Sequence, residues 1–594
     1  MSDFTTRPEI MGRNYVVTSG HYLATAAGAH VMERGGNAID AAAAMCICLN
    51  LLEPFANGIG GEAPTLVYSA AEGRPYAISG MGCSPAALTI DYCREQGIDL
   101  IPGDGFLPAC VPATVDTWAC AVARFGRLRF ADILAPAIEL AEEGFPVYPA
   151  FSRSTEDKAR LFLERYPSTA AIYCPGGRIP RTGERFRNPD FAATLRTMAA
   201  AEEASGGGRE RGIEAARDAF YQGPIAEAIV RFIAEPVLDA TGEEHAGLLT
   251  MDDMAAWRAA AETPCSVDFR GVEVHKCGPW TQGPVFLQQL RLLDGFDLQG
   301  IGHNTADYLH TVIECAKLAF ADREAYYGDP DHDDVPLERL LSAGYADERR
   351  QAIGADASVE MVAGPLGAER LPLADVAADN RAALGIAGRE AGSGAGHAHM
   401  GDTTHCDAID ADGNMVACTP SGGWIGSSPV VPGLGFPIGT RAQMFYLNPN
   451  RANAAAGRKR PRATLTPSLV TRDGRPEMAF GTPGGDGQDQ WTLQVFLNHA
   501  VFGMPLQEAL EAPTVHSTHF PSSFYPRSAH PLGVSAESRI DAGALDELRR
   551  RGHEVRMTGP WGHGKPMAVR IDAERGVIRG GVSPRAVIGY GLGW

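Results

Sequence analysis

Apolar and polar side chains alternate over residues 404–409, a pattern that predicts a β-strand with one buried face. Asp412-Gly413 is a typical pair for the tip of a short hairpin, and residues 415–419 return as a second strand. With the tip at this pair, the numbers of paired residues sum to roughly 825, which places Thr403 opposite residues 421–423. The pattern therefore predicts that two hydroxyl groups meet at the open end of a hairpin.

Apolar residues three and four positions apart predict amphipathic helices elsewhere in the chain, at residues 22–34, 130–143 and 304–327. Asn37 or Asp40 is expected to open a further, Ala-rich helix. Strands are expected at residues 65–68, 76–79, 468–471 and 478–480. Residues 200–212, rich in Ala, Glu, Gly and Arg, are interpreted as a surface insertion. The chain is therefore expected to mix α and β structure, and the absence of a fixed-period repeat argues against a solenoid or a propeller.

A glycine-rich turn separates the short strand at residues 478–480 from the next predicted helix, which Asp486 is expected to cap. Backbone N–H groups of Gly484 and Gly485 would be exposed at this strand-to-helix junction, where such groups can stabilise a developing oxyanion. The alternative is a tight connection that binds no ligand.

Residues 364–402 are rich in Ala, Gly and Asp, and the last of them show no periodicity. This composition predicts a mobile tether that ends where the strand after Thr403 begins. If the bond between Asp402 and Thr403 were cut, the new α-amine of Thr403 could act as base for its own hydroxyl. An α-amine titrates near about pH 8, which suits a general base. The alternative is an ordinary Thr-rich entry to a strand.

Charge and cysteine content narrow the functional classes. Lys and Arg number 52 against 72 Asp and Glu, a net charge of −20 that argues against binding to nucleic acid or anionic membranes. Twelve cysteines without a Cys-x-x-Cys motif indicate buried thiols, and the apolar run 41–52 is too short to span a bilayer. With no secretory signal visible, a cytoplasmic protein is expected. His397, His399 and His405 are not expected to bind a metal, because they flank a glycine-rich segment.

Several motifs occur together in a fixed order, at residues 35–42, 248–257, 269–271, 314–331, 401–414 and 481–485. By these motifs the chain resembles the gamma-glutamyltransferase family of N-terminal nucleophile hydrolases. The resemblance implies an α+β fold, the four-layer αββα sandwich.

The resemblance also implies roles for individual residues. Thr403 would attack the carbonyl of Asp402, cut the chain, and leave a large subunit of residues 1–402 and a small subunit of residues 403–594. Thr403 would then be the nucleophile towards a small-molecule amide, with support from the hydroxyl of Ser421. Gly484 and Gly485 would bind the oxyanion, and water or an acceptor amine would remove the acyl group. The family chemistry implies no metal and no organic cofactor.

The sequence departs from the family pattern where glutamyl-specific members bind their substrate. Met81 stands in place of an arginine that holds the substrate α-carboxylate, and Gly423 and Met444 stand in place of an asparagine and an acidic residue. Ala463 and Thr464 replace a pair of serines. A charged hydrogen bond contributes about 1.5–3 kcal/mol, so the loss of two or three would weaken recognition of a glutamyl group severely.

Three interpretations follow from these departures. The first is an amidase or acylase with a less polar acyl group, which Arg441 or Arg462 could anchor through a carboxylate; the alternative for both arginines is surface solvation. The second is a glutathione hydrolase or transpeptidase that binds the glutamyl group differently. The third is an unprocessed, inactive scaffold or binding protein.

Overall fold

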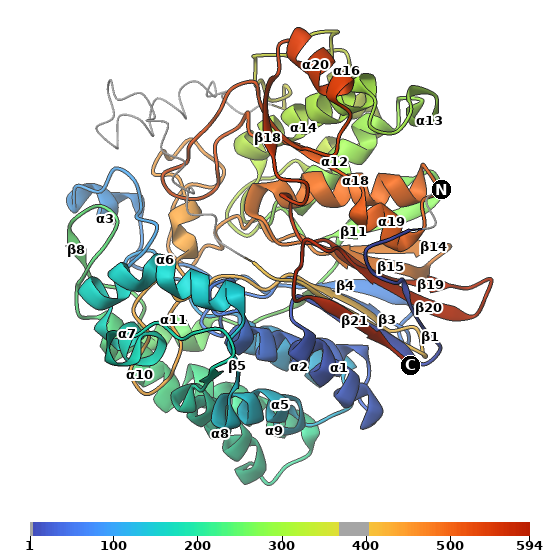
Figure 1. Ribbon diagram of the computed structural model, residues 1–594. Coiled ribbons are helices and arrows are strands. Elements are labelled where there is room, and N and C mark those ends of the chain that lie inside the picture. The colour runs from blue at the N-terminus through green and yellow to red at the C-terminus, as the bar shows by residue number, and fades with distance from the viewer. Residues whose placement is uncertain (1–3, 367–402) are drawn as a thin grey trace.

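Two seven-stranded antiparallel sheets lie face to face in the computed structural model, which describes residues 4–366 and 403–594 (Figure 1). The first sheet has the order β1 (Ile10–Gly12), β20 (Val577–Val582), β19 (Met567–Asp572), β15 (Arg475–Gly481), β14 (Ser468–Arg472), β11 (Val272–Lys276) and β10 (Cys265–Phe269). The second has the order β21 (Tyr590–Gly593), β2 (Tyr15–Ser19), β12 (Cys406–Asp410), β13 (Met415–Cys418), β3 (Thr65–Ser69), β4 (Arg74–Ile78) and β9 (Ala261–Glu262).

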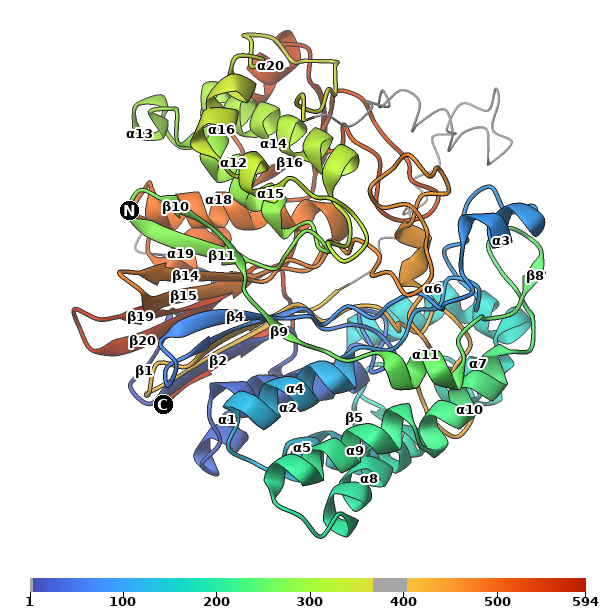
Figure 2. The ribbon, with the colours of Figure 1, turned by 180° about the vertical axis from the view of Figure 1, so that it is seen from behind.

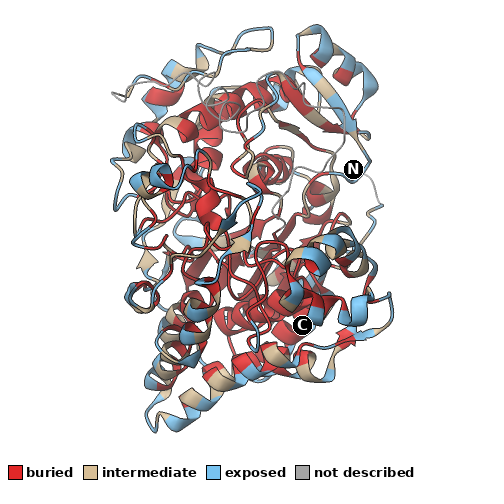
Figure 3. Cartoon of the chain, turned by 90° about the vertical axis from the view of Figure 1, so that its left-hand side faces the viewer, coloured by how far each residue is buried: buried red, intermediate tan, exposed pale blue. Residues whose placement is uncertain are grey.

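Helices cover the outer faces of both sheets, so the molecule has four layers (Figures 1 and 2). The first sheet packs against α12 (Gly283–Leu293) and α18 (Gln488–Ala500), and α14 (Ala306–Tyr326) packs on α12. The second sheet packs against α1 (Tyr22–Glu33), α2 (Ala38–Leu52) and α4 (Thr114–Phe125). Buried residues fill the inner layers, and exposed residues lie on the outer helices (Figure 3). The αββα sandwich expected from the family resemblance is confirmed.

The central hairpin forms in the expected register. Cys406 pairs with Cys418 and Ile409 with Met415, and an isolated bridge joins Thr403 to Ser421. The expectation of a single buried face is wrong, because β12 is buried along its whole length. Cys406 and Ala408 face the core that contains α2, whereas Ile409 faces the core between the two sheets. A strand in the middle of a covered sheet has no solvent face.

The helices predicted from apolar spacing are confirmed as α1, α5 (Phe130–Glu143) and α14. Asn37 caps α2: its side chain accepts from the N–H groups of Ile39 and Asp40, and Asp40 accepts in return from the N–H of Asn37. Residues 200–212 lie mostly at the surface, as expected, but they form the end of one helix, a turn and the start of the next. This segment joins α8 (Pro189–Ala204) to α9 (Arg209–Tyr221), two helices that pack against each other.

The remaining elements surround this sandwich. The further helices are α3 (Ile90–Glu95), α6 (Pro149–Arg165), α7 (Pro167–Tyr173), α10 (Pro224–Ile233), α11 (Met251–Ala256), α13 (Leu298–Ile301), α15 (Leu337–Leu340), α16 (Ala343–Arg350), α19 (Leu506–Glu511) and α20 (Ala542–Arg550). The small sheets are β5 (Phe145–Pro146) with β6 (Arg185–Phe186), β7 (Val237–Leu238) with β8 (Glu244–His245), and β16 (Val515–Ser517) with β17 (Gly533–Glu537) and β18 (Glu554–Thr558). Within the described ranges, none of the helices has the length and apolar character needed to cross a membrane.

Candidate active site

Thr403 and Ser421 lie side by side at the open end of the central hairpin. Their hydroxyl oxygens are 3.1 Å apart, and both residues are 1% exposed. The contact follows from the hairpin register, because the bridge between them continues the pairing of β12 with β13. Asp402 and the expected tether up to it lie outside the described residues, except for residues 364–366.

A buried ion pair stands directly behind Ser421. Arg441 donates from Nη2 to Ser421 Oγ at 2.9 Å and forms an ion pair with Glu62. The backbones of Glu62 and Ser421 also exchange two N–H···O bonds of 2.9 Å each. Burial raises the pKa of Glu62, and the guanidinium of Arg441 opposes that rise. One buried chain of contacts therefore links Thr403, Ser421, Arg441 and Glu62.

The two residues after Thr403 anchor the start of β12. Thr404 donates to a carboxylate oxygen of Glu53 at 2.6 Å. The ring of His405 lies between Thr419 Oγ1, at 2.9 Å from Nδ1, and Asp407 Oδ1, at 2.8 Å from Nε2. His405 is thus held by its own hairpin. His397 and His399 lie outside the described residues.

The glycine loop that follows β15 starts against this hairpin. A Cβ placed on Gly481 would come within 2.3 Å of the His405 ring, so the strand leading to Gly484 and Gly485 packs beside the entrance to β12. Gly484 has φ +127° and Gly485 has φ +53°, backbone conformations that suit glycine. These conformations explain why glycine occupies both positions, and the oxyanion role expected from the sequence stays a prediction.

Asp486 does not cap the next helix, contrary to expectation. Gly487 occupies the N-cap position of α18, and Asp486 instead accepts from the N–H and the hydroxyl of Ser523 at 2.8 and 2.7 Å. Asp486 also forms an ion pair with Arg323. These partners come from distant parts of the chain, so local sequence could not reveal them.

Aromatic side chains and a methionine surround Arg441. The guanidinium carbon lies 5.4 Å from the Trp424 ring centre and 5.6 Å from that of Phe524, and Nη1 lies 3.9 Å from Met444 Sδ. A Cβ on Gly485 would lie 3.1 Å from the Phe524 ring. Phe524 therefore connects the glycine loop with Arg441.

Arg462 is also committed to a buried acid. Its Nη1 lies 3.1 Å from Glu324 Oε1, and Arg323 donates to the same oxygen at 2.7 Å. Burial alone would raise the pKa of Glu324, but Arg462 and Arg323 outweigh it and hold this pKa at about 2. Both Arg441 and Arg462 are 1% exposed, so the alternative of surface solvation is wrong for both.

The other predicted substrate-binding residues line the surrounding core without charge. Met81 is fully buried between the two sheets in the same apolar cluster as Trp280 and Ala463. The backbone N–H of Ala463 donates to Trp280 O at 2.9 Å, and its carbonyl accepts from Gln282 N at 2.8 Å. The side chain of Gln282 in turn donates to Gly485 O at 3.4 Å. Thr464 is 1% exposed.

Gly423 lies in a tight approach of two backbones. Its φ is +58°, and a Cβ there would lie 2.7 Å from the N atom of Gly61. The structure adds Glu62, Phe524, Trp424 and Glu324 to the site. Among them, Glu62 had a signal in the sequence, since an acidic residue follows directly after a run of glycine turns.

A group with the spacing of metal ligands lies outside this site. Among the described residues, ligand atoms of His310, Glu314 and His553 lie within 4.8 Å of one another. His310 Nδ1 and His553 Nε2 are 2.9 Å apart, a hydrogen-bond distance, and Lys317 Nζ lies 2.7 Å from Glu314 Oε1. The ammonium group already neutralises the carboxylate, so this arrangement favours a hydrogen-bond network over a cation site.

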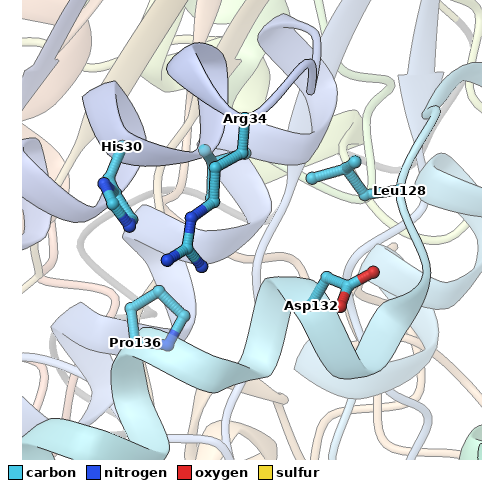
Figure 4. Close-up of a pocket in the computed structure, with 6 residues that line it drawn as sticks. His30, Arg34, Leu128, Asp132 and Pro136 are labelled. Carbon is cyan, nitrogen blue, oxygen red and sulfur yellow. The ribbon is translucent and has the colours of Figure 1, made fainter.

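A surface hollow between α1 and α5 is also separate from the site. It is lined by His30, Val31, Arg34, Leu128, Asp132 and Pro136 (Figure 4). None of these side chains belongs to the residues around Thr403, so the hollow is separate from the site of Thr403 and Ser421.

The four-layer αββα fold is that of the N-terminal nucleophile hydrolases. The family model for gamma-glutamyltranspeptidase matches residues 24–590, and the chain therefore belongs to this family of enzymes. The resemblance stated from sequence motifs is confirmed.

Individual relatives span the whole chain. The glutathione hydrolase-like YwrD proenzyme of Bacillus subtilis (strain 168) is 31% identical over 581 residues, which cover 97% of this chain and 98% of that protein. The solved structure of LmbA2991HD is 42% identical with a TM-score of 0.91, and each chain is covered fully. The structure of cephalosporin acylase from Bacillus halodurans is 30% identical with a TM-score of 0.83, over 100% of this chain and 98% of that one.

Proposed function

We propose that this enzyme is a self-processing amide hydrolase or acyltransferase with Thr403 as its nucleophile. The observation that carries the proposal is the 3.1 Å contact between Thr403 Oγ1 and Ser421 Oγ at the buried start of β12. A nucleophilic hydroxyl needs a neighbouring group that holds it and a base that takes its proton. Ser421 is the first, and the α-amine released by cleavage after Asp402 is the second.

Maturation and catalysis use the same oxygen in this proposal. Thr403 Oγ attacks the Asp402 carbonyl, the C–N bond breaks, and the hydroxyl proton passes to the Thr403 nitrogen. Water then hydrolyses the ester and leaves subunits of residues 1–402 and 403–594. In the mature enzyme Thr403 Oγ attacks the substrate carbonyl, and its proton passes to the α-amine and then to the leaving amine. Water, or an acceptor amine, removes the acyl group.

Gly484 and Gly485 are proposed to stabilise the negative charge that develops on the substrate oxygen. Their loop starts against His405, two residues after Thr403, and its backbone conformation suits glycine. Preorganised N–H donors of this kind lower the barrier by about 3–4 kcal/mol per donor.

We propose an acyl group other than γ-glutamyl. Met81, Gly423 and Met444 offer no charge to a zwitterionic group. Arg441 and Arg462 are neutralised by Glu62 and Glu324, so an anionic substrate would have to compete with a buried carboxylate for either of them. The aromatic and thioether surface around Arg441 favours a less polar acyl group.

A second candidate is a glutathione hydrolase or transpeptidase. The Glu62–Arg441 pair carries both charges that a glutamyl group needs, and Arg441 contacts Ser421. Such a substrate would bind by separating this pair. A steady-state comparison of glutathione and a γ-glutamyl anilide with a panel of N-acyl amides distinguishes the two candidates. Rapid turnover of the γ-glutamyl compounds would overturn the proposed specificity.

Mass spectrometry of the purified protein tests the proposal against an unprocessed, inactive scaffold. Two masses that match residues 1–402 and 403–594 are expected, whereas Thr403→Ala should give one intact, inactive chain. Amide turnover by the intact chain would refute the assignment of the nucleophile.

A cytoplasmic location is part of the proposal, and the free state of all twelve cysteines supports it.

A further inference from the structure

We propose that Arg441 and Glu62 act as a positioning pair that fixes the hydrogen-bond direction of Ser421 and thereby prepares Thr403 for attack. This inference rests on the proposed role of Thr403 as nucleophile. Neither charged residue would touch the substrate, since both would act through the Ser421 hydroxyl.

The direction of the bond between Arg441 and Ser421 follows from the chemistry of the guanidinium group. Arginine has N–H donors and no acceptor, so the 2.9 Å contact of Arg441 Nη2 occupies a lone pair of Ser421 Oγ. The hydroxyl hydrogen of Ser421 must then point to a different partner, and Thr403 Oγ1 lies 3.1 Å away. The distance admits either hydroxyl as the donor, and the proposed direction is from Ser421 to Thr403 Oγ1.

This direction helps the reaction at Thr403. When Thr403 Oγ accepts from Ser421, its own hydrogen is directed elsewhere and can pass to the α-amine. As the Thr403 O–H bond breaks and the new C–O bond forms, the Ser421 hydroxyl donates to an oxygen that becomes more negative. A donor aimed at developing charge lowers the barrier more than it stabilises the ground state.

Glu62 holds Arg441 in place. A guanidinium that is 1% exposed requires a charged partner, and Glu62 is the acid that pairs with it. The two backbone bonds between Glu62 and Ser421 fix the acid and the hydroxyl in one unit. A Cβ on Gly422 would lie 2.3 Å from Glu62 Oε2, so the glycine leaves room for this carboxylate.

The central experiment removes both charges together, because removal of one would leave the other buried and unpaired. Glu62→Gln with Arg441→Met is compared with Glu537→Gln with Arg585→Met, a control pair that is equally buried and joined at 2.7 Å. The readouts are the rate of self-cleavage on a denaturing gel, and kcat and KM for the best amide from the panel.

A fall of about 100-fold in kcat, with KM changed less than about threefold, is expected for the first pair and not for the control. Self-cleavage should slow in parallel, because the same oxygen attacks in both reactions. Arg441→Lys, which keeps a positive donor, should recover part of kcat. If the double variant fails to fold, Arg441→Lys alone decides, with a lowered kcat at constant KM expected. Wild-type kcat and self-cleavage in either folded variant would overturn the inference.

Ser421→Ala tests whether the pair acts through the hydroxyl. Once Ser421 is replaced, the additional change of Glu62 and Arg441 should lower kcat by less than about twofold, because residues that act as a unit are not additive. If the kcat losses from Ser421→Ala and from the Glu62 and Arg441 changes multiply instead, the pair does not act through the Ser421 hydroxyl. An active Thr403→Ala variant would refute the proposed function itself, whereas an inactive Thr403→Ala beside a normal double variant would refute only the positioning pair.

Discussion

Gly484 is in direct contact with Trp491: a Cβ on Gly484 would lie 2.1 Å from Cζ3 of the indole ring. The indole belongs to α18, so the helix that follows the glycine loop also determines how closely the loop can approach it. This contact, together with the φ of +127°, restricts the position to glycine.

Gly484→Ala is therefore expected to destabilise the fold by about 3 kcal/mol, from backbone strain and the displacement of Trp491. Thermal unfolding measures the effect. Gly433→Ala is the matched control, because Gly433 also has a positive φ, +76°, but would meet no atom within 4 Å. A loss of about 1 kcal/mol is expected there. Equal losses in the two variants would show that the Trp491 contact contributes nothing.

Thr403→Ser is expected to keep self-cleavage and amide turnover at a reduced rate, because serine retains the hydroxyl and the liberated amine but lacks the methyl group that restricts χ1. A loss of about tenfold in kcat is expected, measured beside the inactive Thr403→Ala. A Thr403→Ser enzyme that remains uncut while folded would show that this hydroxyl is not the attacking group.

Arg462→Met is expected to affect stability more than substrate binding. Arg462 is one of two arginines that neutralise Glu324, so its loss should cost about 3–5 kcal/mol of unfolding free energy. The KM of a carboxylate-bearing amide should rise by no more than it does for the uncharged analogue. A selective rise of KM for the carboxylate would instead support Arg462 as the substrate anchor expected from the sequence.

The unfolding free energy is expected to depend on pH through His21. The fully buried ring accepts from Leu23 N at 3.1 Å to cap α1, and burial lowers its pKa to about 3. In the unfolded chain the histidine pKa is about 6.5, so the unfolded chain binds the proton more tightly than the folded one. The stability that neutral His21 contributes is therefore fully present above about pH 6.5 and is lost as the pH falls towards 3.

The loss should approach about 1.4 kcal/mol per pH unit below pH 6.5. His21→Asn retains a capping acceptor without the titration, so denaturant unfolding at several pH values should give a shallower decline than for the wild type. Parallel curves for the two proteins would refute the assignment to His21.

Local sequence predicted those parts of the site that depend on neighbouring residues. The register of the hairpin follows from its tip, which is why the meeting of Thr403 and Ser421 was predictable. The apolar spacing within α14 was sufficient to predict that helix, because this pattern also depends on neighbouring residues alone. The burial of both faces of β12 was not predictable, because it depends on a helix and a second sheet contributed by distant segments.

The charged part of the site lay beyond sequence reasoning. Glu62 and Arg441 are 379 residues apart in the chain, and neither periodicity nor turn chemistry connects them. The sequence marked Arg441 as a candidate anchor for a substrate carboxylate, but the identity of its acid required the fold. The same holds for Arg462 with Glu324.

The strand order has a consequence for the two proposed subunits. β12 and β13, which come after residue 402, lie between β2 and β3, which come before it, and β14 pairs with β11 across the same divide. Severing one peptide bond would thus release no fragment, since every ladder of backbone hydrogen bonds at this divide would have to separate as well. Either piece made by itself would present unpaired strand edges, so folding of the intact polypeptide is expected to precede the proposed cut.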